Sequence, residues 1–251
     1  MQESPASPEP RRQPLNISAV IFDYGLVLAR CPTMEEFGLM AKMFSVPYER
    51  FYELWENSRN PYDRGDITAE EYWYRLAAET NTVLDSEGIE TLRKIEVEIW
   101  VHLDTQMLAW TEKLQAAGVK TAVLSNMPLD LADYVRKNFR WLDHFAFKTL
   151  SAEVRSIKPE PAIYEHTLRG LGIAAEQALF IDDRKRNIEA ARKLGIHGIL
   201  YQSLPQLKAE LVKIGFGVLP DVAETASSKR DSASESTKQS PKQQREIKFQ
   251  L

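Results

Sequence analysis

The segment AVIFDYGLVLAR, residues 19–30, carries the pattern that decides the fold. Four apolar residues lead directly into Asp23, and Gly25 follows two positions later. A short apolar run is typical of a strand that is buried on both faces, and the glycine after it is typical of a turn. The pattern therefore predicts a central strand that delivers one carboxylate, Asp23, to its carboxyl end.

Four further apolar runs share this character and predict four more buried strands. They are KTAVLSN (120–126), FAFKTL (145–150), ALFIDD (178–183) and HGILYQ (197–202). Helical patterns separate most of these runs; they cover residues 103–118, 128–139, 161–172 and 184–195. Alternating strands and helices predict an α/β fold, a Rossmann-like parallel sheet flanked by helices.

The interval between the first and second predicted strands is long and helical. It contains four helical patterns, at residues 33–44, 48–58, 68–80 and 87–100. We therefore expect an α-helical cap over residues 32–100, inserted into a core formed by residues 16–31 and 101–221. The two ends, residues 1–15 and 222–251, are polar and cannot bury a core, so we expect them to be disordered.

The overall composition narrows the class of protein. The chain has 251 residues, a net charge of −4 and a single cysteine, Cys31. A mildly acidic chain is unlike a nucleic-acid binder, and no apolar run approaches the roughly 20 residues that span a bilayer. The N-terminus lacks the apolar core of a signal peptide, and one cysteine cannot form an intrachain disulfide. We expect a cytoplasmic protein with no nucleic-acid or membrane partner; the sequence does not indicate its oligomeric state.

Polar residues stand where the predicted strands end. Ser125 and Asn126 end the second run, Asp182 and Asp183 end the fourth, and Lys158 precedes a predicted helix. In an open parallel sheet, ligands bind at the carboxyl ends of the strands. We therefore expect these side chains to meet Asp23 at one edge of the sheet.

Such a set of groups is suited to phosphoryl transfer. Two carboxylates brought together, Asp23 and Asp183, repel each other, and a hard cation such as Mg²⁺ relieves that repulsion. Asp23 can then attack phosphorus and form an aspartyl phosphate. The Ser125 hydroxyl, the Asn126 backbone N–H and the following helix N-terminus would bind the phosphoryl oxygens, and Lys158 would offset their charge. Lys158 would also keep Asp23 ionised.

These motifs, in this order, resemble those of the haloacid dehalogenase-like hydrolase superfamily. The matching stretches are FDYGLVL, VLSN, KPEPAIY and FIDDRKRNIEAARKLG, and the resemblance extends over about residues 17–205. Two stretches, RGDITAEEYWYRL in the cap and SIKPEPAIYEHTL, are similar to a subgroup with small helical caps. That subgroup includes α-D-glucose-1-phosphate phosphatases and the N-terminal phosphatase domain of soluble epoxide hydrolases.

The resemblance implies a role for each motif residue. Asp23 would be the nucleophile and, with the Gly25 carbonyl and Asp183, a ligand of Mg²⁺. Asp182 would act on the metal indirectly or through water, and Lys158 would be the catalytic cation. Ser125, Asn126 and Lys158 would bind the phosphate of a small phosphorylated metabolite.

The sequence departs from the superfamily at Gly25, where most of its phosphatases carry an acid that protonates the leaving group. Three interpretations remain. The first is a phosphatase whose leaving group needs little protonation, such as a sugar 1-phosphate, because an anomeric hydroxyl is more acidic than an ordinary alcohol. The second is a metal-independent 2-haloacid dehalogenase, in which Arg59 or Arg64 of the cap would bind a carboxylate. The third is a non-catalytic binding or regulatory protein.

Aromatic residues are concentrated in the predicted cap, and three of them are consecutive. Tyr72, Trp73 and Tyr74 cannot all face one side of a helix, so at least one should be exposed or face the cleft. The aromatic residues suit either the packing of a small helical domain or a stacking surface for the substrate. The whole set is Tyr52, Trp55, Tyr62, Tyr72, Trp73, Tyr74 and Trp100.

Overall fold

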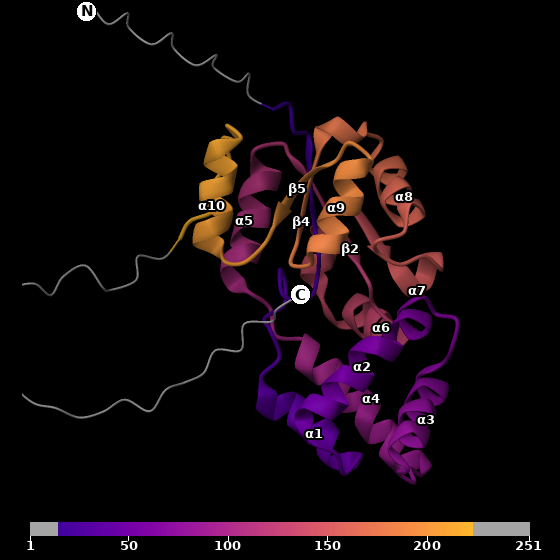
Figure 1. Cartoon of the computed structure of the whole chain (residues 1–251). Helices are drawn as coiled ribbons and strands as arrows, with labels where there is room; N and C mark the ends of the chain where they lie inside the picture. The colour runs from indigo at the N-terminus through magenta and orange to yellow at the C-terminus, as the bar shows by residue number, and fades with distance from the viewer. Residues whose placement is uncertain (1–14, 223–251) are drawn as a thin grey trace, which may run out of the picture.

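The computed structural model describes residues 15–222 and contains the predicted parallel sheet (Figure 1). All strand pairs are parallel, and the spatial order is β3-β2-β1-β4-β5. The strands are β1 (Ala19–Phe22), β2 (Lys120–Ser125), β3 (Phe147–Leu150), β4 (Ala178–Asp182) and β5 (His197–Leu200). Strand order reverses on either side of β1, so Asp23 leaves the sheet at its topological switch point, where ligands bind in such folds.

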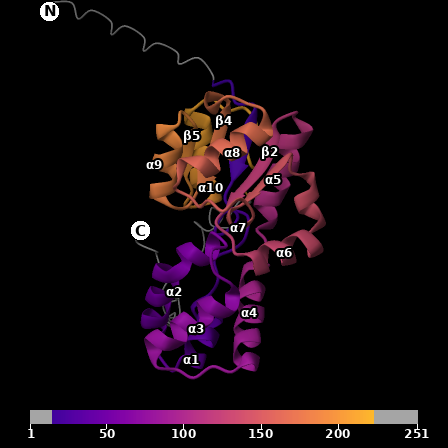
Figure 2. The ribbon, with the colours of Figure 1, turned by 90° about the vertical axis from the view of Figure 1, so that its right-hand side faces the viewer.

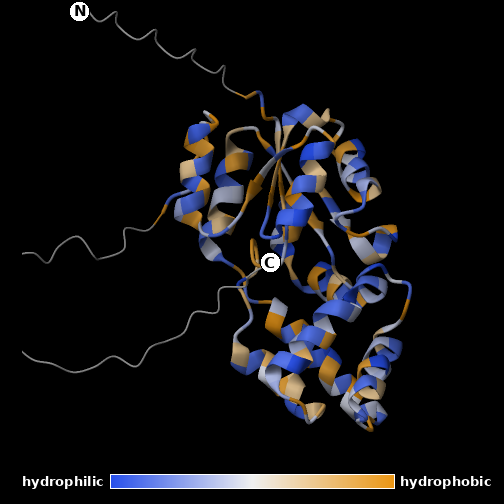
Figure 3. Cartoon of the chain, viewed as in Figure 1, coloured by the Kyte–Doolittle hydropathy of each residue, from blue (hydrophilic) through white to orange (hydrophobic). Residues whose placement is uncertain are grey.

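Helices cover both faces of the sheet. Side chains of α5 (Thr105–Ala116), α6 (Leu129–Asn138) and α10 (Leu204–Lys213) pack on one face. Side chains of α8 (Pro161–Leu171) and α9 (Lys185–Lys193) pack on the other. Successive residues of β1 alternate between these two apolar clusters, which is why the strand sequence is apolar throughout. Figure 3 shows the strands as a hydrophobic centre and the helices as mixed.

Four helices form the cap between β1 and β2. They are α1 (Met34–Met43), α2 (Tyr48–Asp63), α3 (Ala69–Thr80) and α4 (Ser86–Trp100). Thr33 and Thr68 begin α1 and α3 with complete capping boxes. The cap has its own apolar cluster and lies beyond the carboxyl edge of the sheet (Figures 1 and 2). Within it Tyr72 and Trp73 are buried and Tyr74 is exposed, as their consecutive positions required.

Several elements were not indicated by the sequence patterns. The short helix α7 (Ser151–Val154) follows β3 directly, and α10 completes one face of the sheet. Two 3₁₀ turns, η1 (Arg140–His144) and η2 (Ala175–Gln177), precede β3 and β4. Helix α2 also continues through Pro61 to Asp63, five residues beyond the predicted end of that helix.

The structure describes neither end of the chain beyond residues 15 and 222. The segments predicted to be disordered, 1–15 and 222–251, lie almost entirely outside the described residues. Within residues 15–222, no helix has the length and apolar character needed to cross a membrane.

Candidate active site

Asp23 lies at the carboxyl end of β1, held in an extended continuation of the sheet. Its backbone N–H donates to the carbonyl of Ile181 on β4 at 2.9 Å, which fixes the position of the residue relative to the neighbouring strand. The side chain is 8% exposed, and it lines the cavity between core and cap. The Tyr24 N–H donates to Asp23 Oδ1 at 2.6 Å, so part of the carboxylate is oriented by its own turn.

Lys158 joins the first and fourth motifs. Its buried ammonium Nζ lies 2.7 Å from Asp23 Oδ1 and 2.7 Å from Asp182 Oδ2. Asp182 is fully buried, and its oxygens also accept from the Arg184 backbone N–H at 2.8 Å and the Asn187 side-chain amide at 3.0 Å. Both oxygens of Asp182 are thus occupied by N–H donors, and this carboxylate anchors the lysine.

Asn126 fixes the segment that carries Lys158. Asn126 Oδ1 accepts from the Lys158 backbone N–H at 2.7 Å, and its Nδ2 donates to the Lys158 carbonyl at 3.0 Å. The side chain is therefore committed to the loop, and only the backbone of Asn126 is left for a ligand. Ser125 is buried at the end of β2, and its side chain lines the same cavity. Met127 and Pro128 follow it along the cavity wall and lead into the N-terminus of α6.

Three carboxylates gather beside the single ammonium. Asp23, Asp182 and Asp183 each present an oxygen within 4.8 Å of the others. Burial raises the pKa of Asp23 well above its ordinary value; Lys158 opposes this shift, and Asp182 and Asp183 add to it. Lys158 therefore acts in the predicted direction and favours the ionised form of Asp23, although burial has the larger effect on the pKa of this carboxyl. Burial and Asp182 together raise the pKa of Asp183 to about 6.

Gly25 lies against an aromatic side chain from the cap. A Cβ atom added at Gly25 would stand 3.2 Å from Cζ3 of Trp100, the last residue of α4. The Tyr24 hydroxyl donates to the Trp100 carbonyl at 2.7 Å and fixes the end of that helix. The position two residues after Asp23 therefore has no room for a larger side chain unless the indole moves.

The cavity is small, and on its cap side it is lined by α2 and by Trp100 of α4. Its volume is about 90 Å³. Helix α2 supplies Glu56, Arg59, Asn60 and Asp63, which recur at helical spacing on one face. The core side has the motif residues and the apolar side chains of Leu26, Met127 and Leu131. A polar cap surface thus faces the nucleophile across a narrow space.

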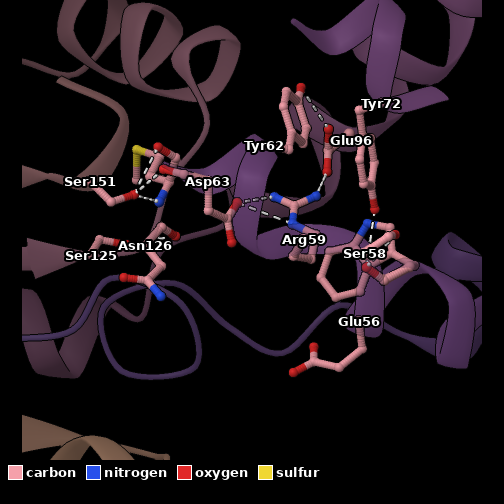
Figure 4. Close-up of polar contacts among 12 residues, drawn as sticks. Glu56, Ser58, Arg59, Tyr62, Asp63, Tyr72, Glu96, Ser125, Asn126 and Ser151 are labelled. Carbon is pink, nitrogen blue, oxygen red and sulfur yellow. Dashed lines mark hydrogen bonds and ion pairs between the residues drawn. The ribbon is translucent and has the colours of Figure 1, made fainter. Parts of the chain in front are cut away.

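Arg59 is buried inside the cap rather than solvated. Its guanidinium pairs with Asp63 (Nη2 to Oδ1, 2.9 Å) and with Glu96 of α4, as Figure 4 shows. It also lies over the rings of Trp55, at 4.5 Å, and Tyr62, at 5.1 Å. Two carboxylates and aromatic faces thus take the place of water around Arg59, and the guanidinium is already paired within the cap.

The structure brings the predicted core residues together at one cavity, and most of the cap residues that line it were not predicted. Asp23, Ser125, Lys158 and Asp183 line one cavity, with Asp182 buried directly behind them. The cap residues carried no motif, and the predicted end of the second cap helix at residue 58 excluded three of them. The polar residues at i, i+3, i+4 and i+7 along YERFYELWENSRNPYD are the signal that could have found them. The cavity residues that the sequence analysis did not name include Glu56, Asn60, Asp63, Arg184 and Arg186; Arg59 was named only for the dehalogenase interpretation.

A fold of this kind with an acidic strand-end site is that of a hydrolase, and comparison with known proteins identifies the family. The model of the haloacid dehalogenase-like hydrolases matches residues 28–195, so the chain belongs to that family. It is 26% identical to the sesquiterpene phosphatase astK of Aspergillus oryzae over 182 residues, which is 72% of this chain and 88% of that protein. It is 30% identical to bifunctional epoxide hydrolase 2 of Rattus norvegicus over 116 residues, 45% of this chain but only 21% of that protein.

Solved structures of the family share the fold. The enzyme bt-2542 of Bacteroides thetaiotaomicron, in complex with magnesium and inorganic phosphate, superposes with a TM-score of 0.61 at 23% identity; 74% of this chain and 94% of that chain are covered. The L-2-haloacid dehalogenase of Xanthobacter autotrophicus, with chloropropionic acid covalently bound, gives a TM-score of 0.58 at 20% identity, covering 83% and 90%. At these identities the likeness concerns the fold alone.

Proposed function

We propose that this protein is a Mg²⁺-dependent phosphatase that hydrolyses a small phosphomonoester through an aspartyl phosphate on Asp23. The observation that carries this proposal is the position of Asp23. It lines a narrow cavity together with an ammonium, a hydroxyl and a helix N-terminus, the groups that bind phosphoryl oxygens. A phosphatase among the relatives, from Aspergillus oryzae, supports the same class of reaction.

The residues around Asp23 fit a divalent cation. With all three clustered carboxylates ionised, Lys158 balances only one negative charge and two remain. The buried Oδ1 of Asn187 also has no hydrogen-bond partner among the described residues. Asp23, Asp183 and the Gly25 carbonyl would hold the ion, with Asp182 acting indirectly through Lys158 or water. Bound Mg²⁺ supplies positive charge against which phosphoryl oxygens are stabilised.

Residues of the chain carry out two successive steps, the attack on phosphorus and the hydrolysis of the aspartyl phosphate. An Asp23 oxygen forms a bond to phosphorus while the bond from phosphorus to the leaving oxygen breaks, and its electron pair stays on that oxygen. Ser125, Lys158 and the N–H groups at the start of α6 hold the phosphoryl oxygens in both steps. Water next attacks phosphorus, the bond to Asp23 breaks, and inorganic phosphate leaves. The leaving oxygen takes its proton from water, because position 25 offers no acid.

The absence of that acid restricts the substrates. General acid help is worth about 10²–10⁴-fold in rate, so a site without it favours leaving groups that depart as stabilised anions. An anomeric hydroxyl is such a group, and we propose a sugar 1-phosphate as the substrate class. The indole of Trp100 stands 3.2 Å from the place of a Cβ atom at position 25, so a larger residue there would press on this ring.

The other two interpretations, a dehalogenase and a non-catalytic binding protein, account for fewer of the residues around the cavity. A dehalogenase has no use for the third carboxylate, and Arg59, which would bind the substrate's carboxylate, already pairs with two acids. A purely binding protein would have no need of a nucleophile held in register by β4 and Lys158 together.

Phosphate release with and without Mg²⁺ tests the proposal. We expect turnover of a panel of sugar 1-phosphates and aryl phosphates in Mg²⁺, its loss in chelator, and its loss in Asp23→Asn. Asp143→Asn, which changes an exposed carboxylate away from the cavity, is the matched control and should retain activity. Halide release without metal would instead establish a dehalogenase, and binding without turnover a non-catalytic protein.

A further inference from the structure

Asp63 is the one cavity carboxylate of the cap without a complete set of partners among the described residues. It is 7% exposed. Its Oδ1 accepts a hydrogen bond from Arg59 Nε at 3.1 Å and forms an ion pair with Arg59 Nη2 at 2.9 Å, whereas its Oδ2 has no partner among residues 15–222. Figure 4 shows this second oxygen turned away from the guanidinium. The other cap carboxylate of the cavity, Glu56, is occupied by two nitrogens of Arg184.

An accessible carboxylate oxygen with no donor is costly unless a ligand or water supplies one. Asp63 lines the same cavity as Asp23, Ser125 and Lys158, and its Oδ2 is not among the fully buried unpartnered atoms of the described residues. Phosphoryl oxygens are acceptors and cannot serve it. Water can supply the donor in the free protein; in the substrate complex, where that water is displaced, the donor comes from the other end of the substrate, which is the leaving group.

The surroundings hold Asp63 in one orientation. Its backbone carbonyl accepts from the hydroxyl of Ser151 in the core, and Ser151 Oγ also accepts from the Met127 N–H at 2.8 Å. Ser151 thus ties the cap residue to the loop that follows Ser125. On the other side, Arg59 is fixed between Asp63 and Glu96. A side chain constrained in this way is preorganised for binding.

Resting on the proposed function, we propose that Asp63 is a specificity-determining residue whose Oδ2 accepts a hydrogen bond from a hydroxyl of the leaving group. The substrate class is then a phosphomonoester of a polyol or sugar rather than of a hydrocarbon. The neighbouring Asn60 amide adds further polar surface on the same helix face. A prenyl chain would displace water from Oδ2 of Asp63 without supplying a donor, so such substrates are disfavoured.

The test compares two kinds of leaving group in Asp63→Asn. Asn keeps the side-chain shape but loses the charge of the acceptor. We expect kcat/KM for a sugar 1-phosphate to fall about tenfold to a hundredfold further than kcat/KM for phenyl phosphate, whose leaving group has no further hydroxyl. An equal change on both substrates assigns Asp63 a structural role and overturns the inference.

Glu96→Gln is the matched control. It removes the other carboxylate that pairs with Arg59, but Glu96 does not line the cavity. We expect it to lower the unfolding temperature and leave the ratio between the two substrates unchanged. A ratio shifted equally by both variants would contradict a direct contact from Asp63.

A second measurement uses the wild-type protein, so it does not depend on whether a variant folds. Singly deoxygenated analogues of a hydrolysed sugar 1-phosphate should include at least one that loses tenfold or more in kcat/KM. Turnover of phenyl phosphate alone, with no hydroxylated phosphomonoester accepted, overturns the inference and the sugar 1-phosphate substrate class, and leaves the proposed phosphatase chemistry on Asp23 intact. No turnover of any phosphomonoester overturns both.

Discussion

At the scale of single residues, the strand ends determine the chemistry. Asp23 and Asp183 follow buried strands and Ser125 is the last residue of one. Parallel strands bring their carboxyl ends to one edge, so the meeting of these residues could be predicted from sequence. Asp63 and Trp100 could not be predicted in this way. Each depends on how a cap helix is turned toward the core, and no short motif encodes that orientation.

Gly25→Asp tests the packing reason for the missing acid. We expect this variant to gain no activity, because a Cβ at position 25 meets Trp100 at 3.2 Å and the longer carboxylate needs more space. Combined with Trp100→Ala, the new acid should raise the hydrolysis of an alkyl phosphate about 10-fold or more over Trp100→Ala alone. Steady-state rates of the four proteins measure this. A gain from Gly25→Asp by itself would show that the indole does not occupy that space.

At the scale of elements, local patterns located all five strands and most helices. The strands could be recognised in the sequence because burial on both faces makes them continuously apolar. Helix α7 has only four residues and ends at Arg155, whose φ of 52° is left-handed, so no periodicity could reveal it. Helix α2 runs past Pro61, where a proline normally indicates an end, because its last turn packs against core and cap at once.

Two helical glycines should respond oppositely to alanine. Gly38 in α1 has open space at its Cβ position, so Gly38→Ala should stabilise the protein by about 0.5–1 kcal/mol through helix propensity. Gly170 in α8 has the ring of Phe147 2.1 Å from that position, so Gly170→Ala should destabilise it by about 1–3 kcal/mol. Urea unfolding measures both. A gain in stability for Gly170→Ala would contradict the packing of α8 on β3.

At the scale of the whole molecule, side-chain pairs distant in sequence hold the cap on the core. Arg184 pairs with Glu56, Arg64 with Glu160, and Arg93 Nε lies 2.6 Å from Asp130 Oδ2. The presence of a cap followed from the long helical interval in the sequence. Its position did not, because pairs separated by up to 128 positions leave no local pattern.

The cap should open as salt is added, because these ion pairs are partly exposed and therefore screened. Single-molecule energy transfer between dyes at Val83→Cys in the cap and Val212→Cys in the core, with Cys31→Ser, would report the opening; both sites are exposed. Neutralising Glu56, Asp130 and Glu160 together should mimic high salt. Glu153→Gln, which breaks the core pair with Arg136, should not. Salt-independent transfer would show that apolar packing alone fixes the cap.

The central claim is that Asp23 becomes covalently phosphorylated. Rapid acid quenching during turnover of a hydrolysed phosphomonoester, followed by peptide mass spectrometry, tests it most directly, because an acyl phosphate joins the side chain to phosphorus. We predict one added phosphoryl group on the peptide that contains Asp23, dependent on Mg²⁺ and absent from Asp23→Asn. Phosphate release with no adduct on Asp23, or with the adduct on Ser125 instead, would contradict the claim.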